Sequence, residues 1–152
     1  MTFRRTLLVI GLLIVAQAVN GQLSYTVNNQ AKYATGRNYI HRENLLDINL
    51  FSGNWTVYSQ LEYSRPPEFG NAFTGIHKFR VEYLTDNLDV KLGHVYPLWN
   101  RGLVLNLRYE RNLGYDSGLI GFESSYALSD HWRLVAAGGK QNFDLSSPTH
   151  ED

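Results

Sequence analysis

Charged side chains stand at every second position in two neighbouring stretches of the chain. The first stretch holds Lys78, Arg80 and Glu82, and the second holds Asp89 and Lys91. Alternate positions of a β-strand share one face, so each stretch predicts a strand with a charged face. Such a face carries fixed charges that meet water, ions or polar solutes. We therefore treat these five residues as candidates for the lining of an aqueous lumen.

A second set of charges is concentrated between residues 97 and 117. Its members are Arg101, Arg108, Glu110, Arg111 and Asp116. The set is dense for a chain in which only 18% of the residues are charged. We predict that these side chains line or plug a pore and form its constriction.

Other kinds of chemistry find little support in the residues. The chain has no cysteine, and its five histidines are scattered without metal-ligand spacing, so we expect neither a metal nor another cofactor. Ser117 lacks the G-x-S-x-G context of a hydrolase nucleophile, so we predict no enzyme and no catalytic residue. Fourteen basic residues balance fourteen acidic ones, which disfavours a nucleic-acid partner.

The elements that must position these charges follow a period of two, and no dozen residues keep a helical apolar stripe. Apolar and polar side chains alternate in eight segments, which we predict as β-strands. These segments are 23–27, 46–50, 55–63, 78–83, 88–92, 103–111, 118–128 and 132–136. The fold class predicted is therefore all-β and antiparallel.

Residues 1–21 have the layout of a cleaved secretory signal peptide. Arg4 and Arg5 precede the apolar run 7–16, and Ala16-Gln17-Ala18 offers small residues at a cleavage site. The apolar run is about half of the ~20 residues that a spanning helix needs. We predict export across the inner membrane of a Gram-negative cell.

The connections between the segments are of two kinds. Tight turns are predicted at 52–54, 85–87 and 129–131, and longer loops at 33–43, 65–76 and 96–101. Short turns on one side and long loops on the other are typical of an up-and-down transmembrane β-barrel in the outer membrane. Four aromatic residues close to the tight turns predict a girdle at one membrane interface. They are Trp55, Tyr83, Tyr126 and Trp132.

The parity of the strands bears on segment 97–117. Three crossings between the turns at 85–87 and 129–131 would put these two turns on opposite sides of the membrane. We therefore favour a seven-strand count in which 97–117 is an excursion that folds into the mouth or the lumen. The alternative is that 103–111 is one more strand, with Arg108 and Glu110 facing inward.

Two runs in this region carry a family resemblance. They are Leu98-Trp99-Asn100-Arg101-Gly102-Leu103 and the stretch from Glu110 to Gly121. These runs resemble a family of porin-like outer-membrane β-barrel proteins of unknown function, and the similarity extends over about residues 22–142. The resemblance implies a barrel of the cell envelope, with no assigned substrate and no catalytic residues.

We interpret residues 22–142 as barrel strands and loops, and 143–152 as a loop or truncated end. No final apolar strand with a terminal aromatic residue follows, which predicts the N-terminal part of a larger barrel. The alternative is a compact eight-strand barrel that closes at Gln141.

Three functional hypotheses follow. The first is a porin-like barrel in the outer membrane that passes small solutes; Asp47, Glu62, Glu123 and Arg133 join the five lumen candidates in its lining. The second is a non-conducting scaffold or binding barrel, whose loops 33–43 and 65–76 meet an envelope partner through Pro66, Pro67, Phe69 and Phe73. The third is a soluble periplasmic β-sandwich. In the first two, outer-membrane lipid and the outer-membrane insertion machinery are the expected partners.

Overall fold

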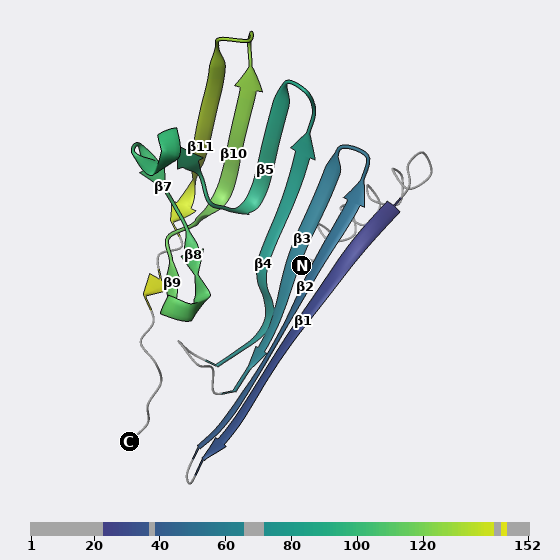
Figure 1. The fold of residues 1–152 in the computed structure, drawn as a ribbon, viewed down its shortest axis with the longest axis vertical. Coiled ribbons are helices and arrows are strands. Elements are labelled where there is room, and N and C mark those ends of the chain that lie inside the picture. The colour runs from purple at the N-terminus through teal and green to yellow at the C-terminus, as the bar shows by residue number, and fades with distance from the viewer. Residues whose placement is uncertain (1–22, 37–38, 66–71, 142–143, 146–152) are drawn as a thin grey trace, which may run out of the picture.

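Seven long strands form one antiparallel sheet in the computed structural model, which describes residues 23–36, 39–65, 72–141 and 144–145. The strands, in the order in which they pair, are β1 (Leu23–Gly36), β2 (Tyr39–Ser52), β3 (Trp55–Ser64), β4 (Phe73–Leu84), β5 (Leu88–Val95), β10 (Leu119–Ala127) and β11 (Arg133–Gln141) (Figure 1). The prediction of an antiparallel all-β fold is confirmed. Within the described residues the sheet is open, with β1 and β11 at its edges. The predicted leader 1–21 lies outside these residues.

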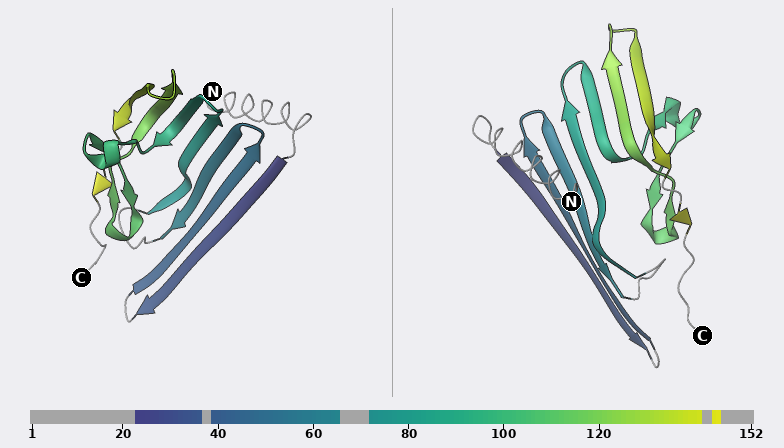
Figure 2. Two further views of the ribbon diagram at one scale, coloured as in Figure 1. Left: turned by 45° about the horizontal axis from the view of Figure 1, so that its top comes forward. Right: turned by 180° about the vertical axis from the view of Figure 1, so that it is seen from behind.

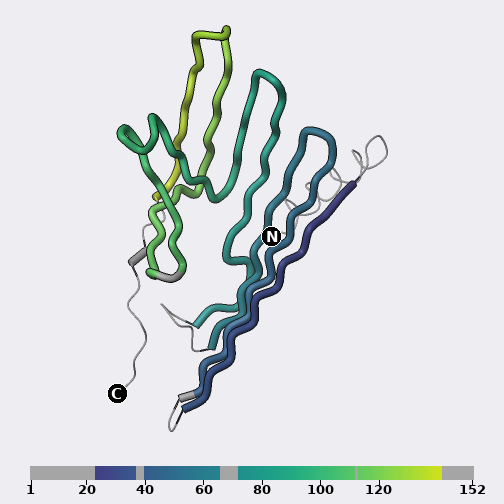
Figure 3. The backbone as a smooth tube through the Cα atoms, viewed as in Figure 1, coloured from purple at the N-terminus to yellow at the C-terminus, as the bar shows by residue number. Residues whose placement is uncertain are grey.

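The three tight turns lie where the sequence places them, and they share one end of the sheet (Figure 3). The loop predicted at 33–43 is wrong, because β1 and β2 form a hairpin that stays paired up to Gly36 and Tyr39. The loop predicted at 65–76 is too long, since β4 begins at Phe73. Pro66, Pro67 and Phe69 lie outside the described residues.

Segment 97–117 does not cross the sheet. β5 pairs directly with β10, from Val95 opposite Leu119 onward, so the seven-strand count is confirmed, as is the prediction that this segment leaves the sheet. Its placement in the mouth or lumen of a barrel stays a prediction. The alternative strand 103–111 is wrong. The excursion consists of β6 (Leu98–Trp99), the 3-10 helix η1 (Asn100–Gly102), β7 (Leu105–Asn106), β8 (Tyr109–Glu110), the 3-10 helix η2 (Arg111–Leu113) and β9 (Tyr115–Asp116).

A short strand also lies within the predicted terminal loop 143–152. It is β12 (Asp144–Leu145), which pairs with β9 of the excursion. The rest of that predicted loop lies outside the described residues. Among the residues that the structure describes, no helix has the length and apolar character needed to cross a membrane.

The register separates polar from apolar side chains across the whole sheet. One apolar row crosses six strands, from β1 to β10: Tyr25, Leu50, Val57, Val81, Leu92 and Phe122. The neighbouring row on the opposite face is Thr56, Glu82, Lys91 and Glu123. Each strand therefore contributes to one apolar face and one polar face, as its alternation predicts.

Burial is inverted relative to an ordinary water-soluble domain. Only Leu45 and Val95 are buried hydrophobic residues in the described part of the chain. The buried residues are mostly polar or charged and include Glu43, Glu62 and Lys78. Tyr25, Leu92 and Phe122 of the apolar row are exposed. This distribution is unusual, because apolar side chains normally fill the interior and charged ones are rarely buried.

A row of glycines crosses β5, β10 and β11, which lie on the other side of the sheet from the β1–β2 hairpin (Figure 2). Gly93, Gly121 and Gly139 stand opposite one another on the polar face. A Cβ atom at Gly121 would lie 2.0 Å from the carbonyl oxygen of Gly138, and one at Gly93 would lie 2.3 Å from that of Phe79. The backbones therefore approach on this face more closely than any side chain permits, as happens where glycine curves a sheet.

Candidate functional site

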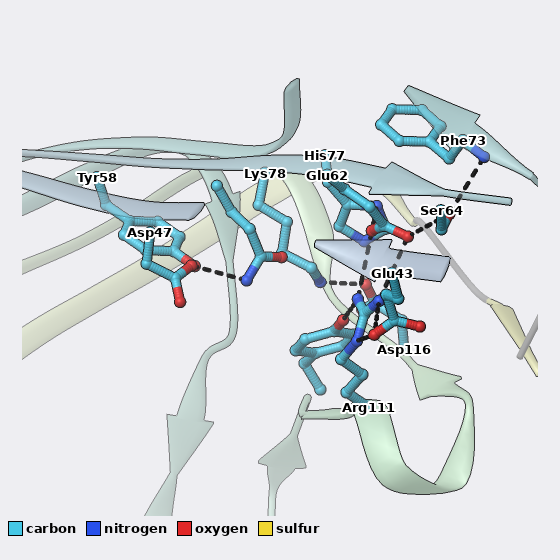
Figure 4. Close-up of polar contacts among 12 residues, drawn as sticks. Glu43, Asp47, Tyr58, Glu62, Ser64, Phe73, His77, Lys78, Arg111 and Asp116 are labelled. Atoms are coloured by element: carbon cyan, nitrogen blue, oxygen red, sulfur yellow. Dashed lines mark hydrogen bonds and ion pairs between the residues drawn. The ribbon is translucent and has the colours of Figure 1, made fainter. Parts of the chain in front are cut away.

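Arg111 of the excursion binds two carboxylates of the sheet (Figure 4). Its Nη2 atom lies 2.8 Å from Glu43 Oε1 on β2, and its Nη1 atom lies 3.3 Å from Glu62 Oε2 on β3. Nη1 also donates a hydrogen bond of 3.1 Å to the hydroxyl of Tyr109. The planar guanidinium group can meet several acceptors at once, so one side chain ties η2 to two strands.

Lys78 on β4 provides the second tie between the sheet and the excursion. Its Nζ atom lies 2.5 Å from Asp116 Oδ2 on β9 and donates a further hydrogen bond to the hydroxyl of Tyr96. The same ammonium group lies 3.3 Å from the centroid of the Tyr109 ring, a cation–π contact. Asp116 is itself held by the backbone N–H of Gly118 at 2.9 Å.

A β-bulge brings His77 into this group. The pairing of β3 with β4 shifts between Gln60 and Leu61, so that His77 has no partner position. In a regular strand His77 would point away from the face that carries Lys78. In the structure its Nδ1 atom lies 2.9 Å from Glu62 Oε2, because a bulge can redirect a side chain.

We call these residues the anchor cluster: Glu43, Glu62, His77, Lys78, Tyr96, Tyr109, Arg111 and Asp116. Its carboxylates and its lysine are almost completely shielded from solvent, with side chains 2–7% exposed. Burial alone would lower the pKa of Arg111, but its hydrogen bonds to Glu62 and Tyr109 raise it, so the guanidinium stays charged. Burial and the Asp116 carboxylate raise the pKa of Tyr96, which remains a neutral donor.

A second group of charges lies on the same face, closer to the tight turns. We call it the charge ladder: Arg80, Glu82, Asp89, Lys91 and Glu123. Arg80 Nε lies 2.6 Å from Glu82 Oε1, and Lys91 Nζ lies 3.4 Å from Asp89 and 3.6 Å from Glu123. These side chains are 16–34% exposed. Water therefore reaches the charge ladder. In the anchor cluster it reaches His77 and Arg111, which are 30% and 24% exposed, but hardly the carboxylates and the lysine.

The structure thus divides the predicted lumen residues between two places. Glu62, Lys78, Arg111 and Asp116 meet in the anchor cluster. The charge ladder is formed by Arg80, Glu82, Asp89, Lys91 and Glu123. Arg101, Arg108 and Glu110 are exposed and belong to neither group. Arg133 is also exposed, on the edge strand β11. Asp47 accepts hydrogen bonds from Tyr58 and Gln60, at 2.9 and 2.8 Å.

Four members of the anchor cluster were not among the sequence candidates. Glu43 lay in a segment predicted as a loop, and His77 lies at a bulge that breaks the alternation. The pair Ile76-His77 after Gly75 interrupts the period of two and is the signal that could have identified the bulge. Tyr96 and Tyr109 carry no signal in the sequence, because their role depends on how the excursion folds.

The arrangement suits mechanical and electrostatic tasks. Its ion pairs hold the excursion against β2, β3 and β4, and so across the polar face. The described residues contain no group of three or more His, Asp or Glu side chains placed to hold a metal ion. What the polar face offers is one shielded end, occupied by the excursion, and one hydrated end lined by charges of both signs.

The fold and this site define a class: an antiparallel all-β sheet protein with an apolar face, a charged face and an inserted segment fixed on the charged one. The chain belongs to DUF6029, a family of unknown function, whose family model matches residues 11–149. Comparison with curated proteins gives no match, and comparison with solved structures gives none.

Proposed function

We propose that this chain forms part of the wall of a porin-like β-barrel in the outer membrane, and that small solutes pass along its polar face. The observation that carries the proposal is the inverted burial of the sheet. In an outer-membrane barrel, apolar side chains face outward because lipid surrounds the wall, and charged side chains face inward because the interior holds water or a polar plug. The apolar face of this sheet is exposed, and its charged face is where burial occurs.

The aromatic residues at the tight turns support this reading. Trp55 and Tyr83 are cross-strand partners on the apolar face, with ring centroids 4.7 Å apart. Tyr126 is on the same face of β10, and Trp132 lies at the end of the third tight turn. Amphipathic aromatic rings prefer the interface between lipid and water. These rings would mark the interface at the tight-turn side.

The bend at the glycine row and the open edges support a larger enclosure. A sheet must curve and tilt in order to close, and glycines at defined positions supply that curvature. In this proposal the edges β1 and β11 pair with further strands, because unpaired edge groups are not tolerated in hydrocarbon. The outer-membrane insertion machinery would assemble the wall, and the leader 1–21 would direct its export.

The excursion gives the proposed passage its constriction. Residues 97–117 leave the sheet at β5 and reach across the polar face to Glu43 on β2. Solutes would therefore meet the exposed charge ladder on one side of the constriction and the anchor cluster at the constriction itself. The signs of the ladder charges nearly balance, so no strong preference for cations or anions is expected.

Conductance across planar bilayers tests the proposal, using the full-length gene product purified in detergent. We expect discrete current steps, and larger steps for Arg111→Met, because loss of the anchor would free the excursion. Arg108→Met, an exposed arginine of the same excursion, is the matched control and should conduct like the natural protein. Currents no larger than those of the empty bilayer would count against a pore.

The anchor cluster also favours a second candidate, a non-conducting scaffold or binding barrel. Its internal pairing of buried charges resembles a permanent plug more than an open channel. Insertion into vesicles without any conductance, even in Arg111→Met, would support this candidate. A soluble β-sandwich would need a second layer over the apolar face, and the described part of the chain provides none there. Solubility of the mature chain without detergent would favour the sandwich.

A further inference from the structure

Two arginines and a tyrosine form a row on the apolar face, at the end remote from the tight turns. Tyr33 on β1 is the register partner of Arg42 on β2, whose guanidinium lies 6.0 Å from the Tyr33 ring centroid. The backbone N–H of Arg65, directly after β3, donates to the carbonyl of Arg42 at 2.8 Å. Alternation puts Arg65 on the same face as Tyr63. We call Tyr33, Arg42 and Arg65 the arginine row.

The positive charges of this row are not neutralised by the described part of the chain. Neither Arg42 nor Arg65 forms an ion pair with any described carboxylate. Of the acidic residues nearest in sequence, Glu43 and Glu62 point to the polar face and bind Arg111, and Glu68 lies outside the described residues. Arg42, Arg65 and Tyr33 are all exposed. An anion from outside the chain would therefore meet two exposed arginines, joined at the backbone, that pair with no carboxylate of the described residues.

The position of the row indicates which anion. Along β3, Trp55 and Tyr63 are both exposed on the apolar face, and their separation of eight residues corresponds to about 26 Å of strand. On a strand tilted by about 40°, Tyr63 then lies about 20 Å from Trp55 along the membrane normal, and Arg65 about 25 Å, which is the height of the apolar band that aromatic girdles flank in outer-membrane barrels. The arginine row lies one step beyond Tyr63. This inference rests on the proposed function, under which the arginine row lies at the level of the lipid headgroups.

We propose that the arginine row binds the phosphate of a lipid headgroup in the leaflet opposite the tight turns. Guanidinium groups bind phosphate through paired hydrogen bonds, and the Tyr33 ring holds Arg42 from one side. The acyl chains of the same lipid would lie along the apolar face below, over Leu46 and Leu61. This continuity between an anionic site and an apolar surface identifies a phosphorylated lipid as the partner, because a soluble phosphate would make no use of the apolar part.

The test is lipid binding to the detergent-solubilised full-length protein, measured by native mass spectrometry. The probes are lipid A with its phosphates, the same lipid dephosphorylated, and inorganic phosphate. For Arg42→Gln with Arg65→Gln we expect affinity for phosphorylated lipid A to fall about 25-fold, with about fivefold from each arginine. Arg42→Lys with Arg65→Lys should lose less, since it keeps the charges. Arg133→Gln, an exposed arginine on β11, is the control and should bind normally.

Three results would overturn the inference: equal affinity for the two forms of the lipid, an unchanged affinity in the double glutamine variant, or displacement of the lipid by equimolar inorganic phosphate. Circular dichroism of each variant shows whether the sheet is retained. Flotation with zwitterionic vesicles distinguishes a failure of the proposed function from a failure of the lipid-binding inference. A chain that does not float without detergent contradicts the proposed function, whereas one that floats but ignores the phosphates contradicts this inference alone.

Discussion

The anchor cluster and the charge ladder contain the same kinds of side chain on the same face of one sheet, yet their surroundings differ. Arg111 and Lys78 are held by carboxylates that solvent hardly reaches, whereas Lys91 meets Asp89 and Glu123 in partial contact with water. A buried charge must keep its partner, while an exposed one loses little when its partner is removed. The comparison teaches that burial of the partner carboxylates, more than residue type, separates charges that hold the structure together from charges that remain in contact with water.

The largest effect is expected from Arg111→Met. The change leaves Glu43 and Glu62 buried without their shared cation, which should lower the free energy of unfolding by about 3–5 kcal/mol. Guanidinium-induced unfolding in detergent micelles, followed by tryptophan fluorescence, measures this loss. Arg108→Met is the control on the same excursion. If both variants lost the same small amount, the anchor cluster would not be what fixes the excursion.

The close backbone approach at the glycine row of β5, β10 and β11 is tested by Gly121→Ala. The added Cβ would meet the carbonyl oxygen of Gly138 at 2.0 Å, so backbone must move, at a cost of about 1–3 kcal/mol. Gly138→Ala is the matched control, because its Cβ would meet only the Phe122 ring, at 3.0 Å, and a side chain can shift. The same unfolding assay applies. If both variants lost the same free energy of unfolding, close contact between backbones would not be what requires glycine at position 121.

The role of the bulge is tested by His77→Ala. Loss of the contact to Glu62 should cost about 1–2 kcal/mol, which is less than at Arg111 because His77 contacts one carboxylate and Arg111 contacts two. His77→Gln keeps a hydrogen-bond donor and should recover part of the loss. Hydrogen exchange at the amides of β3 and β4 would report the change locally. A fully stable His77→Ala variant would show that the bulge contributes nothing to the cluster.

The smallest stability effect is expected in the charge ladder itself. Lys91→Met should cost about 1 kcal/mol or less, since its partners remain hydrated. Under the proposed function the same change shifts ion selectivity toward cations, because one positive charge of two is removed against three negative ones. The reversal potential in a salt gradient measures this shift. Glu82→Gln should move the potential in the opposite direction, and identical potentials in both variants would contradict a solute-facing ladder.

Alternation was sufficient to predict the faces of β3, β4, β5 and β10, because each of these strands separates two different environments. It failed for the tip of the β1–β2 hairpin. There β1 is exposed throughout, and the buried positions of β2 carry the polar His41 and Glu43, so the burial leaves no apolar–polar period in the sequence. Turn-forming residues near Gly36 then suggested a long loop, although a hairpin needs only two connecting residues.

The candidate site was predicted in part. Lys78, Arg111 and Asp116 were identified from their charge and from the parity argument, which correctly removed segment 97–117 from the sheet. Their partners Glu43 and Tyr109 could not be found in this way, since the pairing depends on the path by which the excursion returns across the sheet. No local pattern encodes contacts between residues as far apart as 43 and 111 in the chain.

The glycine row has a geometric consequence for anything that the sheet surrounds. Gly93, Gly121 and Gly139 gather their bend at one corner, whereas the interiors of β2 and β3 contain no glycine at which to fold as sharply. Under the proposed function, a wall that turns abruptly in one place and gently elsewhere would enclose an oval and not a circle. The narrow end of such an oval would be lined by the bare peptide groups of the glycine row, so main-chain atoms would set its width there.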